Sequence, residues 1–312
     1  MTGPDAPRIV CIGAAAIDRK YRARARLLRD TSNPVTSDRA AGGVARNVAE
    51  NLARLGVPTG LVSLVGDDAG GRWLREALQA AGVDTAGLQA AAGLATAEYV
   101  AVLEPDGSLA YGLADMAIFD AITPATLAAA PGLDRAAWIF ADCNLPAPVL
   151  EHLLHGRPRS ARLAVDAVSV AKAARLPRDL AGLDLLFLNE AEAEAILGAA
   201  LAPEGAARAL RERGAAALVL TRGAGGLLAA DPAGVKAVPA FACRVVDVTG
   251  AGDALIAATL HRLVKGDALA EAARWGAAAA SLTIASAASV RPDLSPGLLA
   301  RAMEPHSTAS SR

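Results

Sequence analysis

The sequence has few aromatic residues, few cysteines and almost no net charge, and each shortage narrows what the protein can be. Aromatic residues make up 3% of the 312 residues and alanine is very common, a composition that fits helices packed closely on a sheet. The net charge of −1 provides no overall attraction to nucleic acid or to a membrane surface. The three cysteines, Cys11, Cys143 and Cys243, lie far apart, which argues against a disulfide framework and against a zinc site.

Long apolar segments are also absent. No uninterrupted apolar run reaches the ~20 residues that a membrane-spanning helix needs. The first eight residues lack the charged and then apolar pattern of a signal peptide. We therefore expect a cytoplasmic protein that binds neither nucleic acid nor a membrane. The length suits one large α/β domain with an insertion.

Strand and helix patterns alternate along most of the chain. Strand patterns occupy residues 8–15, 61–65, 138–141, 162–168, 185–188 and 217–221. Helical spacing of apolar residues occurs at 44–55, 71–81, 148–154, 190–197, 203–213, 252–264, 268–285 and 296–302. This alternation predicts a three-layer α/β/α domain whose central sheet is mainly parallel, with ligands bound beyond the carboxyl ends of the strands.

Two segments interrupt the alternation. Residues 18–40 are polar, rich in arginine and irregular in pattern, and residues 96–115 contain the turn Pro105-Asp106-Gly107 between two strand patterns, which predicts a hairpin. A second hairpin is predicted at 227–241. We interpret 18–40 and 96–115 together as a small β lid on a single domain that spans residues 1–304. The polar tail, residues 305–312, is expected to be disordered.

The segment Gly250-Ala251-Gly252-Asp253 carries the strongest chemical signal. A glycine-rich turn that opens a helix leaves backbone N–H groups unpaired, and such groups favour an anion. A carboxylate at the same place would repel a phosphate, unless its task is to take the proton from a hydroxyl that attacks that phosphate. The pairing predicts a kinase; the alternative is an aspartate that caps a helix.

Two further motifs suit the binding of a sugar. The pair Gly42-Gly43 opens a helix and lets a ligand approach the backbone, with Asn47 on the first turn. We place Asp18 at the end of the first strand, where its carboxylate could accept hydrogen bonds from two sugar hydroxyls. Taken alone, the first motif is equally well a flexible turn and Asp18 a cap or turn residue.

Two motifs in the second half suit a nucleotide and its metal ion. Asn189 and Glu192 are one helical turn apart and suit a water-coordinated Mg²⁺, although an N-cap with its capping glutamate is the better interpretation of the pair by itself. The glycine-rich segment from Thr221 to Gly226 follows a strand and could line a phosphate path, or could simply be a turn.

In this chain order the motifs, together with Val65-Gly66-Asp67-Asp68-Ala69-Gly70, resemble the ribokinase (PfkB) family of carbohydrate and nucleoside kinases over nearly the whole chain. The resemblance implies the ribokinase-like fold, a reaction with ATP and Mg²⁺, and Asp253 as general base. It also implies that the N–H groups of Gly250, Ala251 and Gly252 form the anion hole. The open edge of the lid implies a homodimer.

The family pattern assigns further roles by resemblance. The residues implied in substrate binding are Asp18, Ser32, Asn33, Gly42, Gly43, Arg46, Asn47, Thr96, Asp115, Asn144 and Lys172. Those implied in nucleotide binding are Asn189, Thr221, Arg222, Gly223, Gly226, Thr249, Gly250 and Gly252. Glu192 would hold Mg²⁺ through water, and a monovalent cation, K⁺, would bind at Asp247 and Thr249.

Within that family the chain most resembles the pseudouridine kinases. It rests on short matches at residues 32–34, 42–47, 115–116, 141–144, 165–172 and 291–295. Ala167 stands where proline is expected and Ala117 where asparagine is expected, so the nucleoside stays open. The implied reaction is ATP-dependent phosphorylation of the 5′-hydroxyl of pseudouridine. The alternatives are a related kinase for ribose, uridine, adenosine or inosine, and a non-catalytic nucleoside sensor with the same fold.

Overall fold

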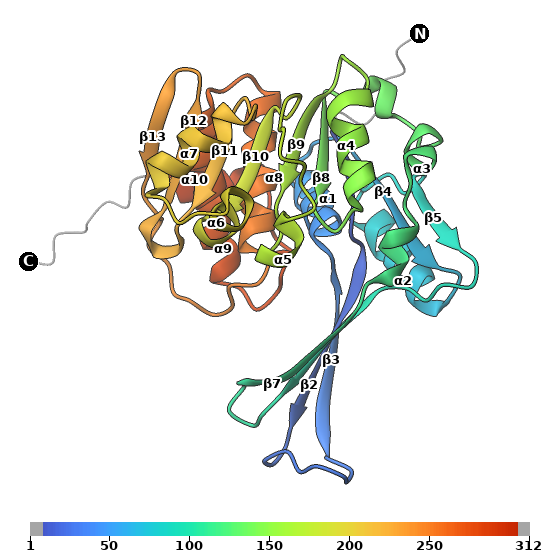
Figure 1. Ribbon diagram of the computed structural model, residues 1–312. Helices are drawn as coiled ribbons and strands as arrows, with labels where there is room; N and C mark the ends of the chain where they lie inside the picture. Colours follow the sequence, from blue (N-terminus) through green and yellow to red (C-terminus); the bar gives the residue numbers. More distant parts are fainter. Residues whose placement is uncertain (1–8, 305–312) are drawn as a thin grey trace, which may run out of the picture.

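The computed structural model describes residues 9–304, and the tail predicted to be disordered lies outside this range. Its main sheet has the strand order β13-β12-β11-β10-β9-β8-β1-β4-β5 (Figure 1). The strands are β1 (Ile9–Ile12), β4 (Thr59–Gly66), β5 (Leu88–Ala91), β8 (Trp138–Asp142), β9 (Arg162–Asp166), β10 (Leu185–Asn189), β11 (Leu218–Thr221), β12 (Leu227–Asp231) and β13 (Gly234–Val238). All neighbours pair in parallel except β11 with β12 and β12 with β13. The predicted, mainly parallel sheet is confirmed.

Helices cover both faces of this sheet. One face packs on α1 (Val44–Arg54), α2 (Ala69–Ala80), α8 (Ala251–Val264) and α9 (Leu269–Ile284), with α10 (Pro296–Met303) behind α9. The other face packs on α3 (Pro124–Ala128), α4 (Ala147–Gly156), α5 (Val170–Ala173), α6 (Glu190–Leu197) and α7 (Pro203–Glu212). Within β1, Val10 and Ile12 join one core and Ile9 and Cys11 the other, because successive strand residues point to opposite faces. The molecule therefore has the predicted three layers.

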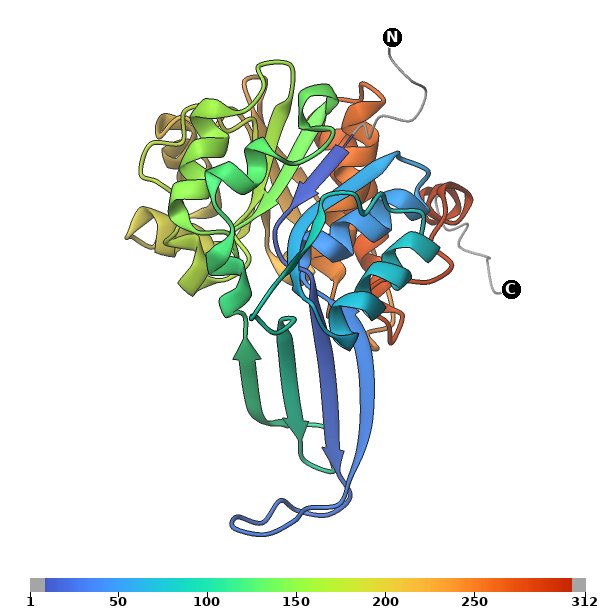
Figure 2. The same ribbon diagram turned by 90° about the vertical axis from the view of Figure 1, so that its right-hand side faces the viewer.

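A second, four-stranded sheet projects from this body (Figures 1 and 2). Its order is β3-β2-β6-β7, with β2 (Ala16–Ala23), β3 (Val35–Gly42), β6 (Glu98–Leu103) and β7 (Leu109–Asp115). We call it the small sheet; its strands come from the two segments that interrupt the alternation in the sequence. The hairpin predicted around Pro105-Asp106-Gly107 joins β6 to β7.

Two expectations for this region are wrong. The arginine-rich segment is not irregular, because β2 and β3 pair along their full length from Ala16–Gly42 to Ala23–Val35. Asp18 does not end the first strand, since β1 stops at Ile12 and Asp18 lies in β2. The break falls at Gly13, whose φ of 146° and close approach to the carboxylate of Asp142 leave no room for a side chain.

No helix within residues 9–304 is both long enough and apolar enough to cross a membrane.

Candidate active site

The start of helix α8 is open to a ligand. Gly250 precedes the helix with a φ of 80°, and the carbonyl of Ser289 occupies the space that a Cβ at Gly250 would need. Gly252 is the opposite case, because no atom lies within 4 Å of the position of its missing Cβ. The first turn therefore faces free space, and its N–H groups can bind an anion there. The N–H of Ala251, predicted to contribute, already donates to the carbonyl of Val248 at 3.3 Å.

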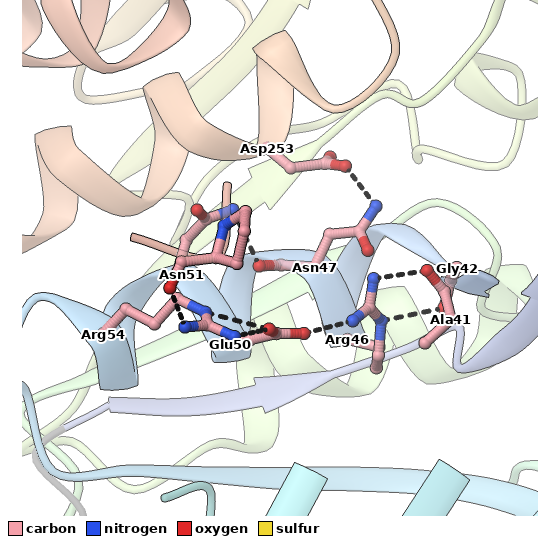
Figure 3. Close-up of polar contacts among 9 residues, drawn as sticks. Ala41, Gly42, Arg46, Asn47, Glu50, Asn51, Arg54 and Asp253 are labelled. Atoms are coloured by element: carbon pink, nitrogen blue, oxygen red, sulfur yellow. Dashed lines mark hydrogen bonds and ion pairs between the residues drawn. The ribbon is translucent and has the colours of Figure 1, made fainter. Parts of the chain in front are cut away.

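Asp253 lies in this first turn and is buried, with 9% of its surface exposed. Its carboxylate accepts a hydrogen bond of 2.7 Å from Nδ2 of Asn47 in α1 (Figure 3). Burial raises the pKa of Asp253 to about 7, although the hydrogen bond from Asn47 and the charge of Arg46 oppose the shift. A carboxylate with a pKa near neutrality is suited to take a proton from an attacking hydroxyl.

The start of α1 lies across from Asp253 and brings two predicted sugar-binding groups together. Gly43 has a φ of 93°, and Gly42 lies against the carboxylate of Asp18. Burial raises the pKa of Asp18, against the charges of Arg46 and Lys20. Oδ1 of Asn47 is buried and accepts a hydrogen bond from no group among residues 9–304. Asp18, Asn47 and the glycine backbone thus offer acceptors to the hydroxyls of a sugar.

Arg46, which the resemblance assigns to substrate binding, is bonded to protein atoms. Its guanidinium donates to the carbonyls of Gly42, at 3.1 Å, and Ala41, at 2.7 Å, and pairs with Glu50. Glu50 also binds Arg54, at 2.6 Å (Figure 3). The side chain is 2% exposed and is engaged with protein atoms. Arg46 therefore braces the backbone where β3 runs into α1.

A cavity of about 210 Å³ beside Asp253 contains two more carboxylates, those of Asp166 and Glu192. Burial and the charges of Asp253 and Glu192 raise the pKa of Asp166, and burial also raises that of Glu192. Asn189 and Glu192 form the capping box that the sequence favours, with Asn189 Oδ1 accepting from the Glu192 N–H and the glutamate accepting in return.

The carboxylates suit a cation held through water. So many buried acids in one cavity repel one another, and a divalent cation with its water shell would relieve this repulsion. Among the described residues no three His, Cys, Asp or Glu side chains converge closely enough to hold a metal directly. The arrangement thus fits a hydrated Mg²⁺. In the sequence, Asp166 belongs to one of the family matches but was given no role at the metal, although its position at the carboxyl end of a strand was the available signal.

A second cavity, of about 260 Å³, also borders the α8 turn, and it shares Thr221, Gly252 and Leu255 with the first. Predicted nucleotide residues Thr221, Gly223, Gly226 and Gly252 line it. Most of the remaining wall is apolar and was missed in the sequence, including Phe241, Val248, Leu255, Ala277, Ala280 and Ile284. Arg222, predicted beside them, donates to the carbonyl of Gly225 at 3.0 Å within its own turn. The cavity suits a flat apolar ring whose polar end reaches the helix turn.

Four predicted substrate residues are not brought together with Asp253. Thr96 donates to Asp68, at 2.6 Å, and lines another hollow together with Asp115. Asp115 pairs with Glu98, and Glu98 with Ile17, so Asp115 lies on the face of the small sheet opposite that of Asp18. Asn33 bonds Leu28 and Thr31 in the β2–β3 loop, at the far tip of the small sheet, beside the exposed Ser32.

Asn144 and Lys172 do contact each other, from the end of β8 and from α5. The N–H of Asn144 donates to Asp142, at 2.9 Å, and the same carboxylate accepts from the N–H groups of Ala14 and Ala45. Asp142 is fully buried and so fastens Asn144 to the start of α1. Burial lowers the pKa of Lys172.

The carboxylate predicted to bind a monovalent cation already has partners. Asp247 Oδ1 accepts from the N–H of Thr249, at 2.9 Å, and from its hydroxyl, at 2.7 Å. Asp247 Oδ2 accepts from Nζ of Lys20 in β2, at 3.2 Å. Burial raises the pKa of Asp247, but the bonds from Thr249 and Lys20 together hold it below its ordinary value.

Known proteins resemble the chain in sequence along almost its full length. A family model described as pfkB family carbohydrate kinase matches residues 6–294. The chain is 33% identical over 293 residues to pseudouridine kinase of Escherichia coli (strain K12), which covers 92% of this chain and 93% of that protein. It is 30% identical over 292 residues to the uncharacterized sugar kinase YeiI of the same strain, covering 92% and 80%.

The fold also matches a solved structure. Arabidopsis thaliana ribokinase, solved with ribose and ATP, superposes with a TM-score of 0.83 at 23% identity and covers 96% of this chain and 99% of that one. At this identity the likeness shows the fold alone, which is the ribokinase-like fold.

Proposed function

The chain belongs to the pfkB family of carbohydrate kinases, and on that premise we propose that it transfers the γ-phosphoryl group of ATP to the 5′-hydroxyl of pseudouridine. The observation that carries the proposal is the buried carboxylate of Asp253, hydrogen-bonded to Asn47 beside the open first turn of α8. The choice of nucleoside is supported by the identity of 33% with a pseudouridine kinase over most of both chains.

The acceptor lies at the start of α1 in this proposal. Asp18, Asn47 and the backbone of Gly43 bind the ribose hydroxyls, and the 5′-hydroxyl lies against Asp253. As the hydroxyl oxygen attacks the γ-phosphorus, its proton passes to Asp253 and the bond to the oxygen of ADP breaks. The N–H groups at the start of α8 stabilise the charge that spreads over the phosphoryl oxygens.

Asp166 and Glu192 would hold the waters of Mg²⁺, and the residues present fit such an ion. When bound, the ion would supply positive charge that offsets the negative charge of the phosphates. The adenine ring of ATP occupies the apolar cavity beside Phe241, Leu255 and Ala277. Thr221 and Gly223 then lie along the path from that ring to the first turn of α8.

Asn144 is the best candidate to contact the base. Pseudouridine presents a ring N–H where uridine has its glycosidic nitrogen, and a buried donor left without an acceptor costs ~1–3 kcal/mol. The sequence offers Asn33, Asp115 and Asn144 as acceptors. Of these, Asn144 is fastened to the start of α1 through Asp142, whereas Asn33 and Asp115 lie elsewhere on the small sheet.

A coupled assay of ADP release tests the proposal with pseudouridine, uridine, adenosine, inosine, ribose and fructose 6-phosphate. We expect the highest kcat/KM with pseudouridine, and no turnover by Asp253→Asn with any acceptor. A higher value with another acceptor would make the protein a related kinase. Absence of turnover with all six would instead favour a nucleoside sensor.

We also propose a homodimer formed through the small sheet and a cytoplasmic location, where ATP is supplied. Tyr111 and Leu113 of β7 are 52% and 58% exposed. They pair with Val102 and Val100 on the face opposite that of Asp18. A second copy that covers these apolar side chains and the unpaired edges of β3 and β7 is the occupant we assign to this face.

A further inference from the structure

The small sheet reaches the loop that leads into α8 through a single lysine. Lys20 lies two residues after Asp18 in β2, so both side chains are on the same face of the sheet. Its Nζ is 3.2 Å from Asp247 Oδ2. Asp247 is three residues before Gly250, where the open turn of α8 begins. A charge on the small sheet is therefore placed beside the backbone that is to hold the phosphoryl group.

Both carboxylate oxygens of Asp247 already accept hydrogen bonds, so few lone pairs remain to coordinate a metal ion. Oδ1 accepts two hydrogen bonds from Thr249, and Oδ2 accepts from the ammonium of Lys20. The hydroxyl of Thr249 points its proton at the carboxylate. Hard cations need several free oxygen ligands at once, and here the charged oxygen that would anchor K⁺ is already bonded to a cation. The residues at Asp247 and Thr249, as arranged, do not fit a bound monovalent ion.

Lys20 is also the cation available to this carboxylate among the described residues. A hollow of about 510 Å³ contains Lys20, Asp247 and the loop 287–290, with the carboxylates of Asp18 and Asp38 in its wall. Its two arginines, Arg46 and Arg54, are both paired with Glu50. Asp38 lies directly across from Lys20 in the β2–β3 ladder. The carboxylates of Asp18, Asp38 and Asp247 thus share the hollow with the ammonium of Lys20, and removal of Lys20 would leave Asp247 without a counter-charge.

We propose that the ammonium of Lys20 replaces the monovalent cation at Asp247, so that phosphoryl transfer by this protein needs no added K⁺. The inference rests on the proposed kinase function. An unpaired carboxylate next to the first turn of α8 would repel the γ-phosphate, and the lysine neutralises it. Lys20 acts through Asp247 and the loop rather than on the substrate, so it is a positioning residue.

The experiment compares initial rates in potassium chloride and in tetramethylammonium chloride at equal ionic strength. We expect the unmodified protein to have the same rate in both salts. Lys20→Met loses about tenfold in tetramethylammonium, the size of one lost charged hydrogen bond, and regains most of it in potassium. Lys20→Arg keeps the rate in both salts. Lys236→Met removes an exposed lysine from β13, outside the hollow that Lys20 lines, and is the control.

The second readout needs no catalysis. Potassium should raise the Tm of Lys20→Met, because the ion then fills the vacated place, and should leave the Tm of the unmodified protein and of Lys236→Met unchanged. Activation of the unmodified protein by potassium, or a Lys20→Met variant indifferent to salt in both rate and Tm, would overturn the inference. If the unmodified protein has no kinase activity, the proposed function is refuted. If potassium still raises the Tm of Lys20→Met in that case, Lys20 still takes the place of a cation at Asp247.

Discussion

At the scale of single residues, Asp253 combines two demands that oppose each other. Burial keeps water away from the place where the phosphoryl group moves, but it also favours the protonated carboxyl, which cannot accept a proton. The hydrogen bond from Asn47 and the charge of Arg46 work against burial and bring the pKa to about 7. The carboxylate is therefore available near neutral pH because of its two neighbours in α1.

This balance predicts the pH dependence of turnover. The kcat/KM of the unmodified protein should rise with pH through about 7, since the ionised carboxylate is the active form. Asn47→Ala removes the hydrogen bond that lowers the pKa and should move the rise to higher pH. Asn51→Ala, whose amide donates to the backbone of Asn47 and does not touch Asp253, is the control. A profile left in place by Asn47→Ala would contradict the assignment.

The raised pKa of Asp253 also predicts that loss of this carboxylate abolishes activity and increases stability. The pKa of Asp253 is raised from 3.8 to about 7 in the folded protein. Between these values the unfolded chain gives up its proton first, so the free energy of unfolding falls as pH rises and levels off above about 7. Asp253→Asn carries no such charge. It should be inactive, yet more stable than the unmodified protein by an amount that grows from pH 5 to pH 7. Thermal unfolding at several pH values measures the difference, and equal pH dependence in both proteins would be the contrary result.

A substitution at Gly252 tests the anion hole without an expected effect on the stability of the fold. A methyl group there meets no protein atom within 4 Å, so Gly252→Ala should keep the Tm. The methyl would occupy the space in front of the first turn of α8 and should lower kcat and weaken ATP binding by about tenfold, the scale of one lost hydrogen bond. Gly205→Ala, inside α7, is the matched control and should change neither kcat nor ATP binding. Normal kinetics in Gly252→Ala would move the phosphate away from this turn.

Individual residues were predicted from the sequence to unequal degrees. Asp253 and the glycines around it stand in one short segment, so their proximity follows from local chain geometry. Asn47 and Asp253 are 206 positions apart, and only the family resemblance put them in one site. Asp115 was placed with the substrate, but the register of the small sheet decides which face it takes, and a shift of one residue reverses it.

At the scale of elements, α1 is held by a ladder of charges along one side. Arg46, Glu50 and Arg54 follow at intervals of four residues, and their ends bond the carbonyls of Ala41 and Pro292. The ladder thus joins the end of β3 to the loop before α10. Glycines 42 and 43 have no side chains with which to fix their own position, so the ladder supplies that rigidity.

Removal of Glu50, the central residue of this ladder, should lower the stability of the protein. Glu50→Ala leaves the guanidinium of Arg46, 2% exposed, without a counter-charge, and loss of one partner of a buried pair costs about 3–5 kcal/mol. We expect the free energy of unfolding to fall by about 3 kcal/mol, the low end of that range, because Arg46 keeps two carbonyl acceptors. Urea unfolding measures it. Arg46→Ala combined with Glu50→Ala should lose less than the sum of the single changes, and strict additivity would show that the two do not interact.

Long helices and buried strands were predicted well, and some short elements were missed. Helices α1, α8 and α9 have apolar spacing over 11, 14 and 16 residues, which leaves little ambiguity. Strand β5 and helix α5 have four residues each, with the sequences LQAA and VAKA, and lack the run of large apolar residues that marks the equally short β1 and β11. Val168 adopts a φ of 67° beside Asp166, a conformation that its branched side chain disfavours and that no sequence rule would suggest.

At the scale of the whole molecule, the alternation of strands and helices was enough to predict three layers and a parallel sheet, because parallel strands require crossover helices. The small sheet was harder to foresee. Its strands β2 and β3 carry charged residues on both faces, and half-buried strands are recognised by a polar and apolar alternation that these lack. The interpretation of two insertions as one unit rested on their failure to fit the alternation.

The exposed side of the small sheet gives the prediction for assembly. Tyr111→Lys together with Leu113→Lys places two charges on the face proposed to meet a second copy, where a desolvated charge is costly. Light scattering after size exclusion should show a dimer for the unmodified protein and a monomer for the double variant. The Tm at low concentration should be the same for both, because the two side chains are more than half exposed within one copy. A monomeric unmodified protein would rule out the assembly.

One buried carboxyl group ties the acceptor side of the cleft into a single rigid piece. Asp142 accepts from the N–H groups of Ala14, Ala45 and Asn144, which belong to three separate stretches of chain. An asparagine there would turn a donor toward a donor and release at least one of them. Side chains mounted on this frame can therefore be exchanged one at a time to change which acceptor fits, whereas a change at Asp142 displaces the frame itself.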